Sequence, residues 1–396
     1  MNTPAAASLS ARLLVVDDNE MNRDLLSRRV QRLGHQTVTA DDGRQALALM
    51  RSQAFDLVLL DITMPEMDGY EVLRQLRDDE ALRHIPVVMV SAIDEIDSVV
   101  RCLELGAEDY LTKPFNPLVL KARVDASLAK KLLRDKELAY AAMMTRELEI
   151  GREIQSGFLP ARLPQPAGWD LAVRFLPARQ VAGDFYDAFE LPGGNLALVV
   201  ADVCDKGVGA ALYMALFRSL IRAAAVQGRG ETPRATLART LAFTNDYIAT
   251  VHERASMFAT VFFAVLDPAT GVLVYANAGH DAPLLWRSHA AAPERLMPTG
   301  PALGLFSGVE LGERELHVLP GDLLLAYTDG VIDATGAAGA FGEERLLEAA
   351  SRRTGEVDGL LALVTQALES HVSGGGQHDD ITLLALARQQ PRAGGG

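Results

Sequence analysis

The sequence is poor in cysteine, in positive charge and in long apolar runs. Its two cysteines, Cys102 and Cys204, lie far apart and outside any metal-spaced pair, so neither a disulfide framework nor a thiolate zinc site is expected. A formal net charge of −14 repels phosphate backbones and argues against nucleic acid as the main partner. No apolar run reaches the roughly 18 residues that span a bilayer, and the first residues lack the features of a signal peptide. We therefore expect a cytoplasmic protein with no membrane partner.

The composition is that of an ordinary globular protein, with 49% hydrophobic and 23% charged residues. A chain of 396 residues favours two or three domains. The patterns described below divide it into an N-terminal tail (1–11), a first domain (12–125), a helical linker (126–160), a second domain (161–388) and a disordered tail (389–396).

The first domain alternates short apolar runs with amphipathic helical stretches five times. This pattern predicts an α/β fold, (βα)5, with a parallel sheet between helices. Polar residues follow the expected strands at Asp17, Asp18, Asp61, Ser91 and Lys113, and the carboxyl ends of parallel strands lie together. Each residue alone would suit a turn or a cap, but as a set the three carboxylates indicate a magnesium site.

The stretches "VVDDNEMNR", "LLDITMPEMDGYEVLRQLR", "VVMVSA" and "DYLTKPF" resemble two-component receiver domains in order and spacing. The resemblance implies a magnesium ion, a partner histidine kinase and a cis peptide bond between Lys113 and Pro114. It also implies a phosphoacceptor, Asp61; magnesium ligands, Asp17, Asp18, Asp61 and the Thr63 carbonyl; switch residues, Ser91 and Tyr110; and a phosphoryl contact, Lys113.

A long helix is predicted after the first domain. Asn116 suits the N-cap and Pro117 the first helical position, and no further proline or glycine occurs before Gly151. About 40 helical residues would extend for about 60 Å. One stripe of this helix contains Tyr140, Met144, Leu148, Gly151, Ile154 or Gln155, and Phe158. The stripe favours a parallel coiled coil that forms a homodimer; the alternative is a single helix that packs on its own domains.

The second domain contains many short strands interrupted by four helical stretches, which predicts an α+β fold with a two-sheet β core flanked by helices. Its candidate site residues are carboxylates at strand ends, Asp184, Asp202, Asp329 and Asp379. Any one of them alone would suit a turn. Together, with no histidine or cysteine ligands, they favour hard ions such as Mg²⁺ or Mn²⁺, and two such ions can activate a water toward phosphorus.

The stretches "AGDFYD", "ADVCDKGVGAALYM", "MFATVFFAVLD", "NAGH", "PALGLF", "YTDGVIDA" and "QHDDIT" resemble the SpoIIE-like branch of the PPM metal-dependent serine/threonine phosphatases. The resemblance implies two Mn²⁺ or Mg²⁺ ions. Asp202 would bridge them, with the Val203 carbonyl on one; Asp329 and Asp379 would hold the first ion and Asp184 the second.

Other positions near these motifs leave more than one role open. Asp380 is expected to support the site, and Asn277 and His280 suit either a strand turn or a catalytic role. The sequence departs from the family pattern "DVSGKG" and the proline that follows it. The departures are Cys204, Asp205 and Gly209; they could alter metal affinity or regulation.

The two resemblances together predict a response regulator whose output is a phosphoserine or phosphothreonine phosphatase. The family implies a phosphorylated STAS-domain anti-sigma-factor antagonist as substrate in a partner-switching pathway. The alternative is a non-catalytic adaptor that binds a sigma factor or its regulator, but such a domain should have lost its acidic residues. A DNA-binding output is not expected, because no helix-turn-helix pattern or basic stripe follows the first domain.

Overall fold

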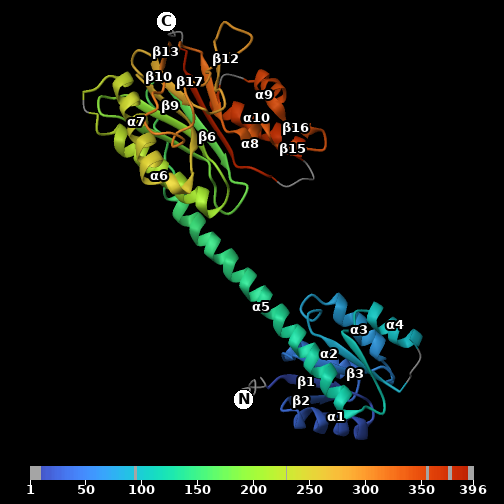
Figure 1. The fold of residues 1–396 in the computed structure, drawn as a ribbon. Coiled ribbons are helices and arrows are strands. Elements are labelled where there is room, and N and C mark those ends of the chain that lie inside the picture. The colour runs from blue at the N-terminus through green and yellow to red at the C-terminus, as the bar shows by residue number, and fades with distance from the viewer. Residues whose placement is uncertain (1–9, 93–95, 229, 354–355, 373–376, 391–396) are drawn as a thin grey trace. The chain divides into compact units, whose positions relative to one another are not determined.

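The computed structural model describes residues 10–92, 96–228, 230–353, 356–372 and 377–390. The chain forms two compact units, Met1–Met144 and Thr145–Gly396, and each is described by itself. Figure 1 labels the elements of both units.

The N-terminal unit is the predicted (βα)5 fold. Its five strands form one parallel sheet in the order β2-β1-β3-β4-β5. The elements are β1 (Arg12–Val16), α1 (Glu20–Arg32), β2 (Gln36–Ala40), α2 (Gly43–Ser52), β3 (Leu57–Asp61), α3 (Gly69–Asp78), β4 (Val87–Ser91), α4 (Ile96–Glu104), β5 (Asp109–Thr112) and the start of α5 (Pro117–Ser156).

Both faces of this sheet are buried, which explains its nearly continuous apolar strands. In β1, Leu14 and Val16 pack into the core on one face, and Leu13 and Val15 pack into the core on the other. Helices α1, α2 and α3 are capped by Asn19, Asp42 and Asp68, whose side chains accept backbone N–H bonds of the first turn. The polar residues that follow the strands therefore collect at one edge of the sheet.

Helix α5 is continuous over 40 residues, from Pro117 to Ser156, and ends four residues before Pro160. Its first turns belong to the N-terminal unit, where Leu120 and Val124 are buried in the core. The predicted stripe is not uniform: Tyr140 and Met144 are exposed, whereas Gln155 is buried in the C-terminal unit. A coiled coil through the exposed part stays a prediction.

The C-terminal unit has the predicted two-sheet β core. The sheets are antiparallel, with strand orders β13-β10-β9-β8-β7 and β12-β11-β14-β17-β6. The strands are β6 (Trp169–Leu176), β7 (Phe185–Glu190), β8 (Leu196–Val203), β9 (Ala259–Leu266), β10 (Val272–Ala278), β11 (Leu284–Trp286), β12 (Glu294–Arg295), β13 (Arg314–His317), β14 (Leu323–Tyr327), β15 (Thr335–Gly336), β16 (Gly339–Ala340) and β17 (Ile381–Arg388). The helices are α6 (Val208–Ala225), α7 (Pro233–Val251), the 3₁₀ turn η1 (Glu253–Ala255), α8 (Asp329–Ile332), α9 (Gly342–Ser351) and α10 (Val357–Val372).

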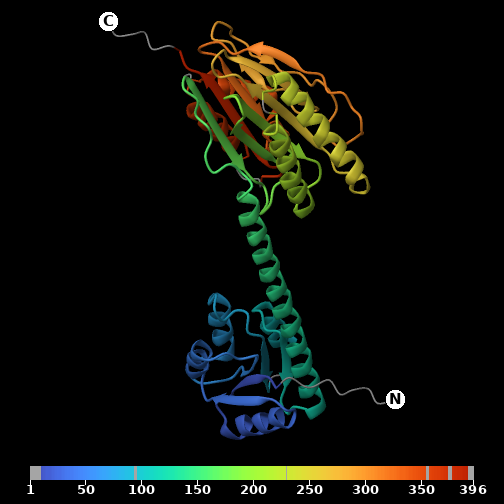
Figure 2. The ribbon, with the colours of Figure 1, turned by 90° about the vertical axis from the view of Figure 1, so that its left-hand side faces the viewer.

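Helices cover both outer faces of the paired sheets (Figures 1 and 2). Strand β8 shows the alternation that this requires: Leu198 and Val200 face the core between the sheets, and Ala197 and Val199 face the core under α6 and α7. Strand β17 alternates in the same way: Leu384 and Leu386 face the core between the sheets, and Leu383 and Ala385 face the core under α9 and α10. The unit is thus a four-layer sandwich of helices, two sheets and helices.

Helix α6 is long and apolar enough, by length and composition alone, to cross a membrane. Its buried residues, among them Met214, Phe217 and Ile221, pack in the core against the first sheet. We therefore assign α6 to the core of the sandwich.

The structure corrects one detail of the predicted site. Strand β14 ends at Tyr327, and Asp329 is the first residue of the short helix α8, so Asp329 lies just beyond the strand end. The two-residue strands β12, β15 and β16 were not predicted, because a repeat of two residues cannot be recognised in so short a segment.

Candidate metal sites

The first acidic cluster lies at the carboxyl edge of the parallel sheet. Asp61 ends β3, and Asp17 and Asp18 follow β1. One carboxylate oxygen from each of the three residues lies within 4.8 Å of those of the other two. Asp17 and Asp61 are buried, whereas Asp18 is exposed. Oxygen ligands at this spacing suit a magnesium ion, as the sequence predicted.

Lys113 joins this cluster from the end of β5. Its Nζ lies 2.7 Å from Oδ2 of Asp17 and 2.9 Å from Oδ2 of Asp61. Burial raises the pKa of Asp61, and the Lys113 ammonium group opposes that shift. The Lys113–Pro114 bond is cis, as predicted.

The remaining predicted residues of this edge lie around Lys113. Ser91 ends β4 and accepts a bond of 2.6 Å from the Lys113 backbone N–H through its carbonyl. Tyr110 is a buried residue of β5. Thr63 is exposed two residues after Asp61. The fold thus brings the ends of β1, β3, β4 and β5 together.

The second acidic cluster lies where the two sheets of the C-terminal unit meet. Asp202 is the penultimate residue of β8 and Asp184 immediately precedes β7, both in the first sheet. Asp184 is 2% exposed, and its Oδ2 accepts bonds of 2.7 Å from the hydroxyls of Thr328 and Thr382. Thr328 follows β14 and Thr382 lies in β17, both strands of the second sheet. Two threonines of the opposite sheet therefore fix the Asp184 carboxylate.

The carboxylates of this cluster raise one another's pKa values. Burial, and then the charges of Asp329 and Asp379, raise the pKa of Asp202 to about 7. Burial also raises the pKa of Asp184 well above its usual range, and the charge of Asp202 adds to that shift. Negative charge is therefore concentrated here beyond what the chain itself compensates, and a bound cation would relieve it.

Asp329 and Asp379 come from neighbouring segments of the second sheet. Gly330 is packed so tightly that a Cβ at this position would lie 1.9 Å from the Asp380 carbonyl oxygen. This contact needs a glycine and holds the start of α8 against the residues before β17. Burial raises the pKa of Asp329, followed by the charge of Asp379.

One lysine enters the cluster. Lys206 Nζ lies 2.7 Å from Oδ2 of Asp379 and donates a bond of 3.0 Å to the His378 carbonyl. Among the described residues, it is the one lysine or arginine paired with any of the four predicted carboxylates. The single ammonium group leaves most of the negative charge uncompensated.

Asp380 has a supporting position, in agreement with its expected role. Its two carboxylate oxygens accept bonds of 2.8 Å from the backbone N–H groups of Ala178 and Gly183. A Cβ on Gly183 would lie 3.0 Å from the Val203 carbonyl oxygen. Asp380 therefore ties the loop that carries Asp184 to the start of β17. The same loop lies close to the end of β8.

Helix α5 holds the same loop from the other side. Gln155 donates a 2.7 Å bond to the Ala182 carbonyl and accepts a 2.9 Å bond from the Ala182 N–H. Its side chain is buried, and a Cβ on Gly151, one turn earlier, would lie 3.5 Å from Val181. The last turns of α5 are thus bonded to the residues immediately before Asp184.

The donor set fits hard divalent ions, because it contains carboxylate oxygens and the Val203 carbonyl and lacks thiolates and imidazoles. Within the described ranges, the N-terminal triad is the one set of three or more ligating side chains in which all ligand atoms lie within 4.8 Å of one another. The second cluster is more widely spaced. Oxygen ligands of one octahedral magnesium ion lie at most about 4.2 Å apart, so Asp202, Asp329 and Asp379 would have to move closer together to share one ion.

Asn277 and His280 have structural contacts. Asn277 Nδ2 donates to the Leu296 carbonyl, and its Oδ1 accepts from the His280 N–H. The His280 ring lies 2.8 Å from the Thr260 hydroxyl, and burial lowers the pKa of His280 to about 4. These bonds favour the strand-turn role that the sequence left open.

Several residues near the cluster were missed by the sequence analysis, namely Thr328, Thr382, Lys206 and Asp281. Asp281 follows the "NAGH" motif, and burial together with the charge of Asp329 raises its pKa to about 6. Lys206 lies in the motif that begins with Asp202, but its partner, Asp379, is 173 residues away. Such contacts carry no local signal in the sequence.

The departures from the family pattern have distinct surroundings. Asp205 has φ +72°, a conformation that glycine tolerates better, and its Oδ1 accepts a bond from the Lys206 N–H. Cys204 Sγ accepts a 3.2 Å bond from the Phe258 N–H. Gly209 has open space around the position of a Cβ.

The two folds and their acidic clusters define a receiver domain joined to a PP2C-type phosphatase domain. The family model described as "Response regulator receiver domain" matches residues 13–125, and the one described as "Stage II sporulation protein E (SpoIIE)" matches residues 192–389, half of the chain. The chain belongs to the SpoIIE family and carries an N-terminal receiver domain.

Individual relatives agree with this assignment. Protein IcfG of Synechocystis sp. is 42% identical over 267 residues, 61% of this chain and 41% of that protein. Response regulator PleD of Caulobacter vibrioides is 44% identical over 221 residues, 53% of this chain and 48% of that protein. The chain thus spans less than half the length of either relative. A solved structure of the SiaA-PP2C domain of Pseudomonas aeruginosa covers 63% of this chain and 98% of its own, with a TM-score of 0.54 and 22% identity, which supports the fold alone.

Proposed function

We propose that the C-terminal domain is a metal-dependent phosphoserine and phosphothreonine phosphatase. The observation that carries the proposal is the acidic cluster of Asp184, Asp202, Asp329 and Asp379. The raised pKa values of Asp184, Asp202 and Asp329 and the single lysine partner of the cluster, Lys206, call for added positive charge. Asp202 would bridge two ions, and the Val203 carbonyl would bind one of them; Asp329 and Asp379 would hold the first ion, and Asp184 the second.

Two bound divalent ions, Mn²⁺ or Mg²⁺, would activate a water and stabilise the charge on the phosphoryl oxygens. The chain's own residues position this chemistry. Thr328 and Thr382 orient Asp184, Asp380 fixes the preceding loop, and Lys206 neutralises part of the charge of Asp379. Hydrolysis joins the water oxygen to phosphorus, breaks the bond to the serine or threonine oxygen and returns a proton to that oxygen.

The receiver domain would control this activity. A histidine kinase would phosphorylate Asp61, with a magnesium ion held by Asp17, Asp18, Asp61 and the Thr63 carbonyl, and with Ser91, Tyr110 and Lys113 responding to the phosphoryl group. Helix α5 supports such a connection, because it begins in the receiver and its Gln155 bonds to Ala182. The contacts of Gln155 favour the loop before Asp184 as the place where the signal would enter the phosphatase domain.

The substrate that the family favours is a phosphorylated STAS-domain anti-sigma-factor antagonist in a partner-switching pathway. The acidic site suits such a role because the ions, and not basic side chains, would receive the phosphoryl group. A homodimer formed through the exposed part of α5, and a cytoplasmic location, belong to the same proposal.

The experiment measures phosphate release from a phosphoserine peptide with and without Mn²⁺. Wild-type protein should be active only with the ion. The rate of phosphate release should fall at least about a hundredfold in Asp202→Ala and in Asp329→Ala, since each substitution removes a ligand on which the site depends. Equal rates in all three proteins would reject the phosphatase and leave the adaptor as the better account. Control by the receiver is tested with beryllofluoride, an acyl-phosphate mimic: a response that persists in Asp61→Ala contradicts it.

A further inference from the structure

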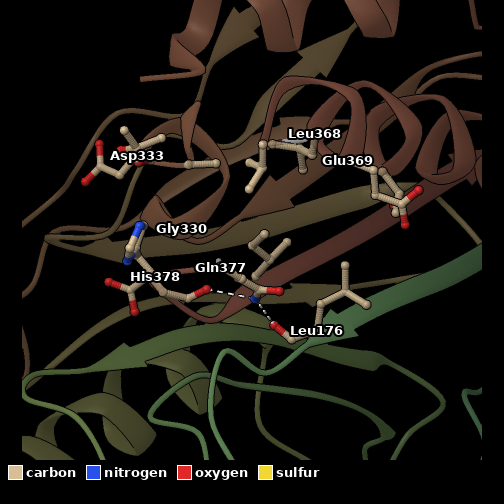
Figure 3. A pocket seen from close by; sticks show the side chains of 13 residues that line it. Leu176, Gly330, Asp333, Leu368, Glu369, Gln377 and His378 are labelled. Atoms are coloured by element: carbon tan, nitrogen blue, oxygen red, sulfur yellow. Dashed lines mark hydrogen bonds between the residues drawn. The ribbon is translucent and has the colours of Figure 1, made fainter. Parts of the chain in front are cut away.

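A cavity of about 430 Å³ opens beside the acidic cluster of the phosphatase domain. Figure 3 shows Leu368 and Glu369 of α10 on one side of it, and Leu176 and Gln377 on the other. Leu176, Leu368 and Ile381 form an apolar lining that continues the core beneath α10. The cavity therefore offers apolar surface to a side chain that enters from solvent.

The rim of this cavity is acidic. Asp333 follows α8, and Glu369 lies on the last turn but one of α10; both are exposed. Gln377 Nε2 donates bonds of 2.6 and 2.8 Å to the carbonyls of Leu176 and Asp379. These bonds hold the wall of the cavity in place. An apolar interior with a negative rim is complementary to a large apolar side chain next to a basic one.

The cavity is continuous with the candidate active site. Asp379, a predicted metal ligand, lines it, as does Gly330, which adjoins Asp329. A peptide whose phosphorylated residue lies at the cluster would therefore place a nearby side chain at the cavity mouth. Its negative rim makes a free anion a poor occupant.

We propose that this cavity binds a flanking residue of the phosphoprotein substrate. The occupant is a large apolar side chain close in sequence to the phosphorylated serine or threonine, accompanied by a lysine or arginine that faces Asp333 and Glu369. The inference rests on the proposed function and deepens it, because the metal cluster selects the phosphoryl group while the cavity selects the sequence around it.

The test uses the full chain and a library of short phosphoserine peptides, in which a leucine with an adjacent arginine occupies each position on either side of the phosphoserine. In matched peptides, leucine is replaced by alanine or arginine by glutamate. Para-nitrophenyl phosphate, which has no flanking residues, reports the activity of the metal site itself. Peptide binding is measured separately by fluorescence anisotropy.

Two substitutions probe the cavity and two matched ones serve as controls. Thr365→Trp fills the cavity from α10 and Glu369→Lys reverses the charge of its rim, since both residues line it. Gln366→Trp and Glu344→Lys make the same changes at exposed positions outside the lining. The quantity compared is the kcat/KM ratio of peptide to para-nitrophenyl phosphate.

We expect one register of the leucine-arginine pair to be preferred by about tenfold or more, the discrimination that burial of one leucine side chain supplies. Thr365→Trp should abolish the preference for leucine and Glu369→Lys the preference for arginine, while both controls retain them. A wild-type enzyme that hydrolyses all peptides alike, or cavity variants that behave like their controls, would overturn the inference.

Failure of the proposed function has a different signature. If para-nitrophenyl phosphate and every peptide remain intact with Mn²⁺, the phosphatase proposal fails. The anisotropy measurement then still tests whether the cavity binds a flanking residue. Peptide binding that depends on the flanking residues and is lost in Thr365→Trp supports the inference. Binding that is independent of the flanking residues, or that Thr365→Trp retains, overturns it.

Discussion

The side chain of Gln155 exchanges two hydrogen bonds with the backbone of Ala182, one to its carbonyl and one from its N–H. Gln155 lies in the last turn of α5, and Ala182 lies two residues before Asp184. A movement of the helix end would therefore be transmitted directly to a candidate metal ligand. This short path makes α5 a plausible carrier of the receiver's signal.

Replacement of Gln155 tests this path. Gln155→Ala leaves two backbone groups of Ala182 without their partner, and we expect a loss of about 1 to 3 kcal/mol in the free energy of unfolding. Because the loop also positions Asp184, the Mn²⁺ concentration needed for half-maximal activity should rise and the response to beryllofluoride should disappear.

The matched control is Gln165, whose side chain makes the same pair of bonds to the backbone of Leu171. Gln165→Ala should cost comparable stability without changing the Mn²⁺ requirement. If both variants shift the Mn²⁺ requirement equally, the special role of Gln155 is wrong.

The approach of Gly330 to Asp380 gives a second prediction. Gly330→Ala would place a Cβ within 1.9 Å of a carbonyl oxygen, so the backbone must move, at a cost of about 1 to 3 kcal/mol. Phosphatase activity should fall together with the stability. The start of α8 and the residues before β17 must separate, and these two segments carry Asp329 and Asp379. Gly209→Ala is the control: its Cβ meets open space in a helix, so a gain of about 0.5 to 1 kcal/mol is expected. Full activity of Gly330→Ala would contradict the assignment.

Asp187 lies three residues after Asp184 but has a different role. It is 1% exposed and lies 3.0 Å from Arg218 and 2.9 Å from Arg222. Asp187→Ala would leave the buried guanidinium of Arg218 unpaired, and we expect a loss of about 3 to 5 kcal/mol.

The exposed pair of Arg174 and Asp358 provides the comparison, and Asp358→Ala should cost less than about 1 kcal/mol. Urea denaturation followed by tryptophan fluorescence measures both, since both tryptophans, Trp169 and Trp286, belong to the C-terminal unit. Equal costs for the two variants would show that Arg218 does not depend on Asp187.

Buried His280 gives a pH-dependent prediction. Its pKa is lowered from 6.5 to about 4 by burial, so between these values the unfolded chain binds a proton that the folded chain does not. The stabilising effect of the neutral ring is complete above pH 6.5 and is lost as the pH falls to about 4, a change of about 3 kcal/mol. Between pH 6.5 and about 4, the free energy of unfolding of His280→Asn should therefore fall by about 3 kcal/mol less than that of the wild type. Parallel curves for wild type and variant would contradict the burial of a neutral imidazole.

Much of the fold was predictable from the sequence because its signals are local. The five alternating segments of the receiver and the absence of proline between Pro117 and Gly151 predicted the (βα)5 domain and the long helix α5. Many short apolar segments such as Leu196–Val203, interrupted by helical stretches, predicted the two-sheet core. The acidic residues were found for the same reason, since each ends or precedes a recognisable strand.

The rest depends on contacts between distant segments. Nothing near Gln155 in the sequence indicates that it bonds to Ala182, and nothing near Thr382 indicates a bond to Asp184. Helix α8 was missed because Asp329 and Gly330 suit a turn equally well, and its four residues are too few for a helical period. The supporting residues become visible only when both sheets are assembled.

The most direct test of the central claim is anomalous diffraction from crystals of the full chain soaked in Mn²⁺. The account predicts two peaks about 3.5 to 4 Å apart among Asp184, Asp202, Asp329 and Asp379, with Asp202 in contact with both, in addition to the receiver site. Peaks confined to Asp17, Asp18 and Asp61 in crystals that retain this fold would contradict it.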